Sequence, residues 1–230
     1  MYILSIETAT EQCSVALHTC EGKFVVQKNA VLPNAHSEQL GALIEELLRA
    51  QAIAPQKLAA IAISEGPGSY TGLRIGTSLA KGMCFALAIP LIAVNTLQAL
   101  ALSIQEKITR KLPENTVFVP MIDARRMEVY TAQWNAQNEE IQTSNALIVD
   151  EHSLSQFSSN YYYCIGGNGS AKCAELLRNA HIEYVPKVVN QAKTVGDIAC
   201  NLFAQQQFVS TAYFEPLYLK EFQTTAKKLC

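Results

Sequence analysis

A glycine-rich turn that leads into an apolar helix is the feature that most constrains the fold of this 230-residue chain. Residues 64–76 read S-E-G-P-G-S-Y-T-G-L-R-I-G, between a strand-like run at 61–63 and a helix predicted over 72–87. The glycines and the proline interrupt both periodic patterns, so they mark a tight turn between the two elements. A strand, a turn and a helix in this order are typical of an α/β protein.

The turn matches neither of the two common phosphate-binding loops. A P-loop needs a lysine directly after its last glycine, but Gly72 is followed by Leu73 and Arg74. A dinucleotide loop needs a third glycine, at 71, and an acidic residue about twenty positions further on. Residue 71 is a threonine, and residues 86–100 contain no acid. The glycines are therefore predicted to serve backbone geometry rather than phosphate binding.

The helix after the turn is small and apolar on nearly every face. Such a helix requires burial all round. One face can meet the sheet, and the other either packs under a second helix, predicted at 37–49, or docks against another chain. Gly76, Ala80 and Gly82 would permit close approach in both cases, so the pattern alone leaves both interpretations open.

The two halves of the chain carry similar hairpins. In each half the first predicted strand leads into a polar turn through an acidic residue, Glu7 in one half and Asp123 in the other. Two α/β lobes that each open on such a hairpin are the layout of the actin-like ATPase superfamily, where the hairpins hold nucleotide phosphates. The expected fold class is therefore α/β, actin-like (ASKHA, RNase H-like) and two-lobed, with a reduced second lobe.

The lobes are expected at 1–104 and 105–210, with the tail at 211–230 packing back on the first lobe. The periodic pattern predicts strands at 2–6, 13–18, 23–28, 58–64, 91–94, 117–122, 128–134 and 161–165, and helices at 37–49, at 72–87, from Thr96, from Ser170 and at 195–206.

Four residues are candidates for contacting a nucleotide: Glu7, Asp123, Gly167 and Gly169. The turns after the two acids lack the glycine that lets backbone amides close around a phosphate, which favours inherited acids that cap turns. The glycine turn at 166–169 could receive an anion at the N-terminus of the helix predicted after it, although a strand-to-helix turn needs glycine in any case. No cofactor is predicted.

The net charge of the chain does not indicate a nucleic-acid-binding surface. The formal net charge is −2 at pH 7, whereas nucleic-acid-binding domains usually carry a basic face. Any RNA partner is therefore expected to be reached with help from another protein. A few basic clusters could add a direct tRNA contact: Arg125, Arg126, Lys220, Lys227 and Lys228.

The cysteines and the N-terminus indicate a reducing compartment. The seven cysteines are odd in number and contain no C-x-x-C pair, so neither a disulfide framework nor a zinc ribbon is expected. The N-terminus lacks the pattern of a signal peptide, and no apolar run approaches the roughly 18 residues that span a bilayer. The protein is predicted to be cytoplasmic and to make no membrane contact.

The sequence shows no catalytic or metal-binding constellation. The four histidines (18, 36, 152 and 181) are scattered without helical spacing, so no imidazole metal site is expected, and each is predicted to be a surface or capping residue. Ser69 does not fit the G-x-S-x-G pattern of a serine hydrolase. No catalytic residue and no metal ligand are predicted.

The chain resembles the TsaB (YeaZ) family, whose members are small paralogues of the tRNA-modifying enzyme TsaD. The resemblance covers nearly the whole chain, and the long glycine motif is its most specific part. It is carried by I-E-T-A-T at 6–10, C-S-V-A-L at 13–17, H-S-E at 36–38, G-P-G-S-Y-T-G-L-R-I-G at 66–76, D-A-R at 123–125 and P-L-Y-L at 216–219.

The resemblance implies a required, non-catalytic partner and activator of TsaD, which installs the threonylcarbamoyl group on adenosine 37 of tRNAs that read codons starting with A. It implies a heterodimer with a TsaD-like paralogue, a TsaE-like ATPase that joins through the complex, a homodimer when the chain is alone, and tRNA reached indirectly.

In that family the first two helices form the subunit contact. The expected interface is therefore His36, Leu40, Leu43, Leu73, Ile75, Gly76, Leu79, Ala80, Gly82 and Met83. A bulky residue at Gly76 or Gly82 is expected to abolish the complex and to leave a folded monomer.

Two enzymatic alternatives stay open. The first is a nucleotide-dependent small-molecule or carbamoyl kinase of the actin-like superfamily, with Glu7 and Asp123 handling magnesium and ATP. The second is the metal-dependent glycoprotease activity formerly assigned to TsaD relatives. TsaD carries a metal-binding histidine pair after the strand that corresponds to 91–94, whereas residues 95–100 of this chain read N-T-L-Q-A-L. This difference favours a scaffold over an enzyme.

Overall fold

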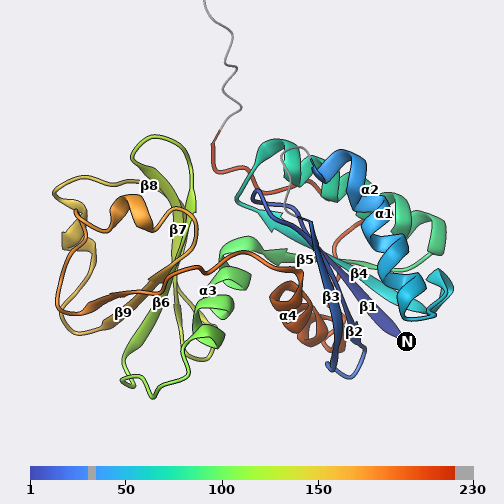
Figure 1. Cartoon of the computed structure of the whole chain (residues 1–230), viewed down its shortest axis with the longest axis horizontal. Coiled ribbons are helices and arrows are strands. Elements are labelled where there is room, and N and C mark those ends of the chain that lie inside the picture. The colour runs from blue at the N-terminus through green and yellow to red at the C-terminus, as the bar shows by residue number, and fades with distance from the viewer. Residues whose placement is uncertain (31–34, 221–230) are drawn as a thin grey trace, which may run out of the picture.

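Two five-stranded sheets lie side by side, one in each half of the molecule (Figure 1). The computed structural model describes residues 1–30 and 35–220, and only the backbone of residues 35–38. The first sheet has the order β3-β2-β1-β4-β5. Its strands are β1 (Tyr2–Glu7), β2 (Cys13–Thr19), β3 (Phe24–Ala30), β4 (Leu58–Gly66) and β5 (Leu91–Asn95).

The second sheet repeats the topology of the first, with the order β10-β9-β6-β7-β8. In each sheet an antiparallel meander of three strands is followed by two parallel strands, and Glu7 and Asp123 end the equivalent strands β1 and β6. The predicted echo between the halves is therefore confirmed. The strands are β6 (Thr116–Asp123), β7 (Glu128–Asn135), β8 (Glu140–Ile148), β9 (Tyr162–Gly166) and β10 (Ile182–Tyr184).

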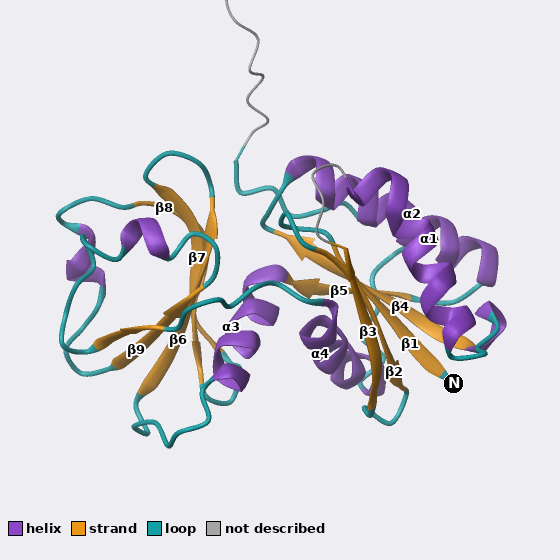
Figure 2. Ribbon diagram, viewed as in Figure 1, coloured by secondary structure: helices purple, strands orange, loops and turns teal. Residues whose placement is uncertain are grey.

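Two helices cover the outer face of the first sheet, and two others lie between the sheets (Figure 2). The outer helices are α1 (Ala35–Ala50) and α2 (Tyr70–Leu87). The helices between the sheets are α3 (Thr96–Lys107) and α4 (Ala192–Ala204). No helix in the described part of the chain is long and apolar enough to cross a membrane.

Helix α3 follows the strands of the first sheet in the chain but packs mainly on the second sheet. Helix α4 follows the strands of the second sheet but packs on the first. Leu100 and Ile104 of α3 pack with Phe118 of the second sheet, whereas Val195 of α4 packs with Ile3 of the first. The lobe boundary expected at 104–105 therefore falls inside α3, and α4, although part of 105–210, packs on the first sheet. Each helix buries an apolar stripe, and the stripe does not reveal which sheet it will cover.

The second lobe is reduced where the first carries its long outer helix. The helix predicted from Ser170 is absent, and the 3-10 turn η3 (Ala171–Cys173) stands in its place. Two further 3-10 turns are η1 (Pro55–Lys57) and η2 (Ser153–Gln156). The sequence pattern also missed strands β8 and β10, because β8 is mostly half-exposed and β10 spans three residues.

The described part of the tail runs along the first lobe and then reaches the second. Phe214 packs against the core of the first lobe, and the backbone N–H of Leu217 donates to the carbonyl oxygen of Glu65 at 2.7 Å. Lys220 then forms an ion pair with Glu128 on β7. Residues 214–220 therefore join the two lobes at the surface.

Candidate functional site

The glycine-rich turn packs directly against the turn between β1 and β2. A Cβ atom on Gly72 would lie far inside contact distance of the carbonyl oxygen of Thr8, and one on Gly68 would meet the carbonyl oxygen of Ala9 in the same way. The Ser69 backbone N–H donates to that Ala9 oxygen at 2.7 Å. The glycines therefore permit the close approach of two backbone segments, as predicted.

Glu7 lies in the interior rather than in an open cleft. Its side chain is fully buried, and its Oε1 accepts from the Ala9 backbone N–H at 2.6 Å. Burial raises the pKa of Glu7 from its ordinary 4.5 to about 7, partly offset by the Ala9 N–H and by the nearby Ser64 hydroxyl. The Ser64 hydroxyl does not reach hydrogen-bond geometry, and Glu7 Oε2 also lacks a partner. Glu7 thus caps the β1–β2 turn from the interior of the first lobe.

The raised pKa of Glu7 predicts a fall in stability with rising pH. The unfolded chain ionises above pH 4.5, whereas the folded chain keeps the proton until about pH 7. The stabilisation from the neutral carboxyl is therefore complete below pH 4.5 and is lost by pH 7, a change of up to about 3 kcal/mol. Glu7→Gln, which stays uncharged, should flatten this part of the curve in urea unfolding at pH 5, 6 and 7. Equal pH dependence in both proteins would contradict a buried neutral acid.

Asp123 lies at the surface and is already paired. Its carboxylate forms an ion pair with Lys172, and its Oδ1 accepts from the Arg125 backbone N–H at 2.9 Å. Partial burial raises the pKa of Asp123, but the bonds from Lys172 and Arg125 outweigh that effect and hold the pKa below its usual value. Asp123 therefore caps its own turn and is neutralised by Lys172.

The glycine turn of the second lobe copies the one in the first. Gly167 has a φ of +111°, and a Cβ atom there would collide with the carbonyl oxygen of Met121. A Cβ atom on Gly169 would lie 2.9 Å from the backbone nitrogen of Asp123. Since η3 spans only three residues, no helix N-terminus stands ready for an anion. The anion-binding interpretation of Gly167 and Gly169 is therefore corrected.

The histidines whose side chains the structure describes belong to no metal-binding group. No group of His, Cys, Asp or Glu that could hold a metal occurs in residues 1–30 and 35–220. His18 departs from the expected surface position, because it is fully buried and its Nε2 lies 3.0 Å from Asp197 Oδ1. Gly196 leaves room for the His18 ring, because a Cβ atom on residue 196 would overlap it. His18 thus ties β2 to α4.

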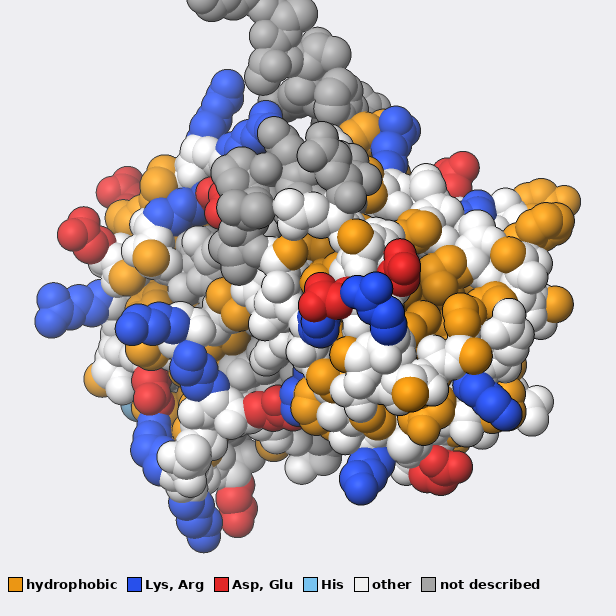
Figure 3. Space-filling view, turned by 45° about the vertical axis from the view of Figure 1, so that its right-hand side comes forward, with side chains coloured by type: hydrophobic (Ala, Val, Ile, Leu, Met, Phe, Trp, Pro, Cys, Tyr) orange, Lys and Arg blue, Asp and Glu red, His pale blue; other side chains and the backbone are white. Residues whose placement is uncertain are grey.

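An open apolar groove runs between α1 and α2. Its volume is about 360 Å³, and it is lined mostly by hydrophobic side chains and helix backbone. Figure 3 shows hydrophobic side chains gathered on the right-hand side of the molecule, where these helices lie. The groove is lined by Gly41, Ile44, Glu45, Leu48, Arg49, Ile53, Pro55, Leu79 and Met83.

Only part of the expected interface borders this groove or the open surface beside it. Leu79 and Met83 line the groove, and Leu43 and Ile75 are half-buried beside it. Gly82 is exposed, and a Cβ atom there would meet nothing within 4 Å. These five residues stay available to a partner.

The other expected interface residues are corrected or lie outside the description. Leu40, Leu73, Gly76 and Ala80 are buried inside the first lobe, because their side of each helix faces the sheet. A Cβ atom on Gly76 would collide with the Thr8 hydroxyl oxygen. A bulky residue there would therefore damage the fold instead of leaving an intact monomer. The side chain of His36 lies outside the described residues.

Sequence reasoning did not assign Phe85, an exposed aromatic residue of α2, to the interface. Phe85 is 87% exposed, one turn beyond Gly82 on the same side of the helix. A large aromatic side chain in water points to a contact surface. The available signal was the spacing of Gly82 and Phe85 at an interval of three, which puts them on the same side of the helix.

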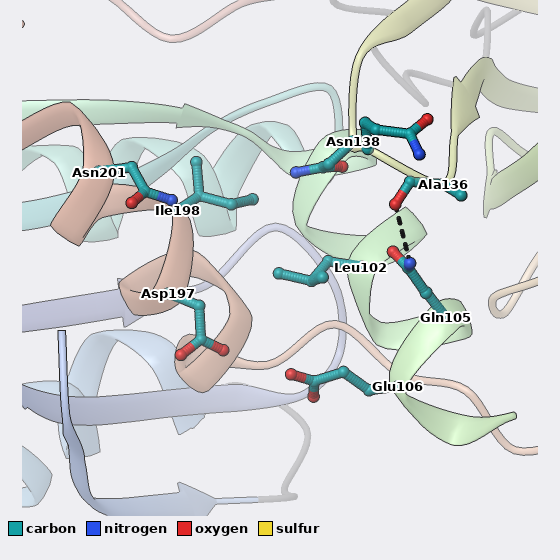
Figure 4. A pocket seen from close by; sticks show the side chains of 9 residues that line it. Leu102, Gln105, Glu106, Ala136, Asn138, Asp197, Ile198 and Asn201 are labelled. Carbon is teal, nitrogen blue, oxygen red and sulfur yellow. Dashed lines mark hydrogen bonds between the residues drawn. The ribbon is translucent and has the colours of Figure 1, made fainter. Parts of the chain in front are cut away.

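A second cavity of about 470 Å³ lies between α3, α4 and the β7–β8 turn. Figure 4 shows Glu106 of α3 and Asp197 of α4 pointing into it. Both carboxylates bind Lys193, at 2.6 and 2.8 Å, and Gln105 donates to the carbonyl oxygen of Ala136 at 2.9 Å. The Lys193–Glu106 pair joins α3 to α4, and the Gln105 bond ties α3 to the β7–β8 turn.

The family model for TsaD, tRNA N6-adenosine threonylcarbamoyltransferase, matches residues 25–227 of the chain. The TsaB protein of Escherichia coli K12, a tRNA threonylcarbamoyladenosine biosynthesis protein, is 30% identical over 96% of this chain and 95% of its own length. The chain belongs to the TsaB family. The crystal structure of YeaZ from Pseudomonas aeruginosa agrees, with 25% identity, a TM-score of 0.79 and coverage of 95% of this chain and 99% of that one.

More distant structures show the fold alone. The activator of 2-hydroxyisocaproyl-CoA dehydratase from Clostridium difficile, solved with bound ADPNP, has a TM-score of 0.52 at 9% identity and covers 90% of this chain and 97% of that one. With the repeated sheet topology, this similarity shows that the TsaB-family chain has the actin-like α/β fold expected from its hairpins.

The motifs that carry the TsaB resemblance gather where backbone segments meet. The long glycine motif joins β4 to α2, and D-A-R forms the turn between β6 and β7. P-L-Y-L lies in the tail, where the Tyr218 ring centroid is 4.7 Å from that of Tyr70 at the start of α2. The motifs of this TsaB-family chain thus mainly fix its turns and lobe contacts.

Proposed function

We propose that this chain is a non-catalytic partner and activator of a TsaD-like enzyme in the formation of threonylcarbamoyladenosine at position 37 of tRNAs that read codons starting with A. Membership of the TsaB family and the match to the TsaD family model support this role. The observation that carries the proposal is the open apolar groove between α1 and α2, which Leu79 and Met83 line, on a helix that also exposes Phe85.

This surface suits a helical partner. Apolar area removed from water contributes about 25 cal/mol per Å², so filling the groove would drive association. Gly41 and Gly82 add room for close approach, because a Cβ atom on either would meet nothing within 4 Å. A helix from the partner can therefore approach the backbone of α1 and α2 closely.

The chain is proposed to act by contact rather than by chemistry. The two inherited acids are engaged as turn caps, Glu7 in the interior and Asp123 with Lys172. At the position of the TsaD histidine pair, Asn95 caps α3 through its side chain, and Leu97 and Leu100 are buried. These side chains serve folding, which supports a subunit without a reaction centre of its own.

The same surface would serve two assemblies. In the absence of the TsaD-like enzyme, a second copy of the chain would cover the groove and form a homodimer. The two assemblies would exclude each other because they share α1 and α2. A TsaE-like ATPase would join through the heterodimer, and the complex would work in the cytoplasm.

Leaving the chain out of a reconstitution tests the proposal. TsaD- and TsaE-like proteins from the same organism, together with the threonylcarbamoyl donor, ATP and a tRNA transcript, should form threonylcarbamoyladenosine only when this chain is added. Mass spectrometry of nucleosides from digested tRNA measures the product. Equal product without the chain would contradict the activator role. Tight magnesium-ATP binding by the isolated chain in calorimetry would favour the kinase alternative instead.

A further inference from the structure

The turn between β6 and β7 has an unfavourable backbone conformation. Arg125 and Arg126 have φ angles of +69° and +49°, in the left-handed region where the Cβ atom of an ordinary residue crowds the backbone. Glycine or asparagine would adopt this conformation more easily. Two consecutive arginines in it suggest that their side chains are needed at this place.

Lys172 holds the turn in that conformation. Its ammonium group donates to the carbonyl oxygens of Arg126 and Glu128, both at 2.7 Å, and forms an ion pair with Asp123. All three N–H donors of Lys172 are thus used within the hairpin. The three bonds from Lys172 hold the β6–β7 turn in place and offset the unfavourable backbone conformation.

Within the described residues, the two guanidinium groups at the tip make no hydrogen bond or ion pair, although the charge of Arg125 helps to lower the pKa of Asp123. Both arginines are exposed. The acids of the same hairpin are neutralised by lysines, Asp123 by Lys172 and Glu128 by Lys220. The hairpin therefore presents two exposed arginines on a backbone turn that Lys172 holds in place.

We propose that Arg125 and Arg126 bind phosphate groups of the tRNA backbone when the chain is assembled with its TsaD-like partner. This inference rests on the proposed function. A guanidinium group binds phosphate with two parallel N–H bonds, and phosphate contacts position RNA without reading its sequence. The carboxylates of the hairpin pair with lysines and not with the two arginines. This arrangement favours an anion from another molecule as the ligand of the arginines. Because the formal net charge is −2, the two arginines alone would hold tRNA weakly, and the partner would supply the rest of the site.

Salt-dependent tRNA binding by the assembled complex tests this site. Fluorescence anisotropy with an unmodified tRNA transcript that reads a codon starting with A would compare the wild type with Arg125→Gln/Arg126→Gln between 50 and 200 mM KCl. Removing both arginines should weaken binding about 10-fold at low salt and reduce the slope of log K against log salt by about 1 for each arginine. Arg125→Lys/Arg126→Lys should keep most of the slope. The matched control, Lys57→Gln/Lys111→Gln, removes the same charge from two exposed positions elsewhere and should change little.

Assembly with the TsaD-like enzyme is measured separately by size-exclusion chromatography. Unchanged tRNA affinity and slope in an assembled Arg125→Gln/Arg126→Gln complex would overturn the proposal, and the activator role would still stand. Failure of this variant to assemble would assign the arginines to a protein contact and would also overturn it.

Discussion

Replacing Gly72 with alanine is expected to destabilise the protein by about 1–3 kcal/mol. Gly72 lies in the first turn of α2, where alanine is normally the better helix former. The new Cβ atom would collide with the backbone carbonyl oxygen of Thr8, which cannot move without shifting the β1–β2 turn. The loss of packing should therefore outweigh the gain in helix propensity, and urea unfolding followed by circular dichroism measures the balance.

Gly82→Ala is the matched control for this prediction. The same chemical change is made ten residues further along the same helix, where a Cβ atom meets nothing within 4 Å. Gly82→Ala should stabilise the protein by about 0.5–1 kcal/mol, because a glycine in an exposed helix position is less favourable than alanine. Shifts of the same sign in both variants would contradict the close contact between the glycine turn and Thr8.

Gly82→Glu is expected to abolish binding to the TsaD-like enzyme. Glutamate is a good helix former and the position is open, so the monomer should stay folded. In the complex the carboxylate would be buried without a partner in an apolar contact, which should weaken association on the order of 100-fold. Isothermal titration calorimetry of the variant against the partner measures the loss.

A charge placed elsewhere on the surface controls for net charge. Ala204 is exposed at the end of α4, between the two sheets rather than on the outer face that carries α1 and α2. Ala204→Glu adds the same charge and should bind the partner as the wild type does. Wild-type affinity in Gly82→Glu, or an equal loss in Ala204→Glu, would argue against docking on the groove.

The sequence alone predicted the parts of the fold that depend on local pattern. The three-stranded meander at the N-terminus, the glycine turn and helices α1 and α2 all appear close to their expected positions. These elements have strong periodicity and clear stop signals, such as Pro55 after α1. The paired acids Glu7 and Asp123 also occupy equivalent places, because each ends the first strand of its sheet.

Features that depend on contacts distant in sequence were not predictable in the same way. Gly76 and Gly82 look alike in the sequence, yet one touches Thr8 and the other faces solvent. The distinction depends on which side of α2 meets the sheet. The burial of Glu7 and the packing of α3 and α4 likewise depend on how the lobes pack. The tight pairing of His18 with Asp197 joins residues 179 positions apart.

The yield of threonylcarbamoyladenosine with the Gly82→Glu variant tests most directly whether this chain acts through its groove. The full reconstitution would contain the TsaD- and TsaE-like proteins, the donor, ATP, tRNA and either the wild-type chain or the variant, with the fold of the variant verified by its unfolding curve. The modified nucleoside should fall to the level seen without the chain. A wild-type yield from the folded variant would contradict the account.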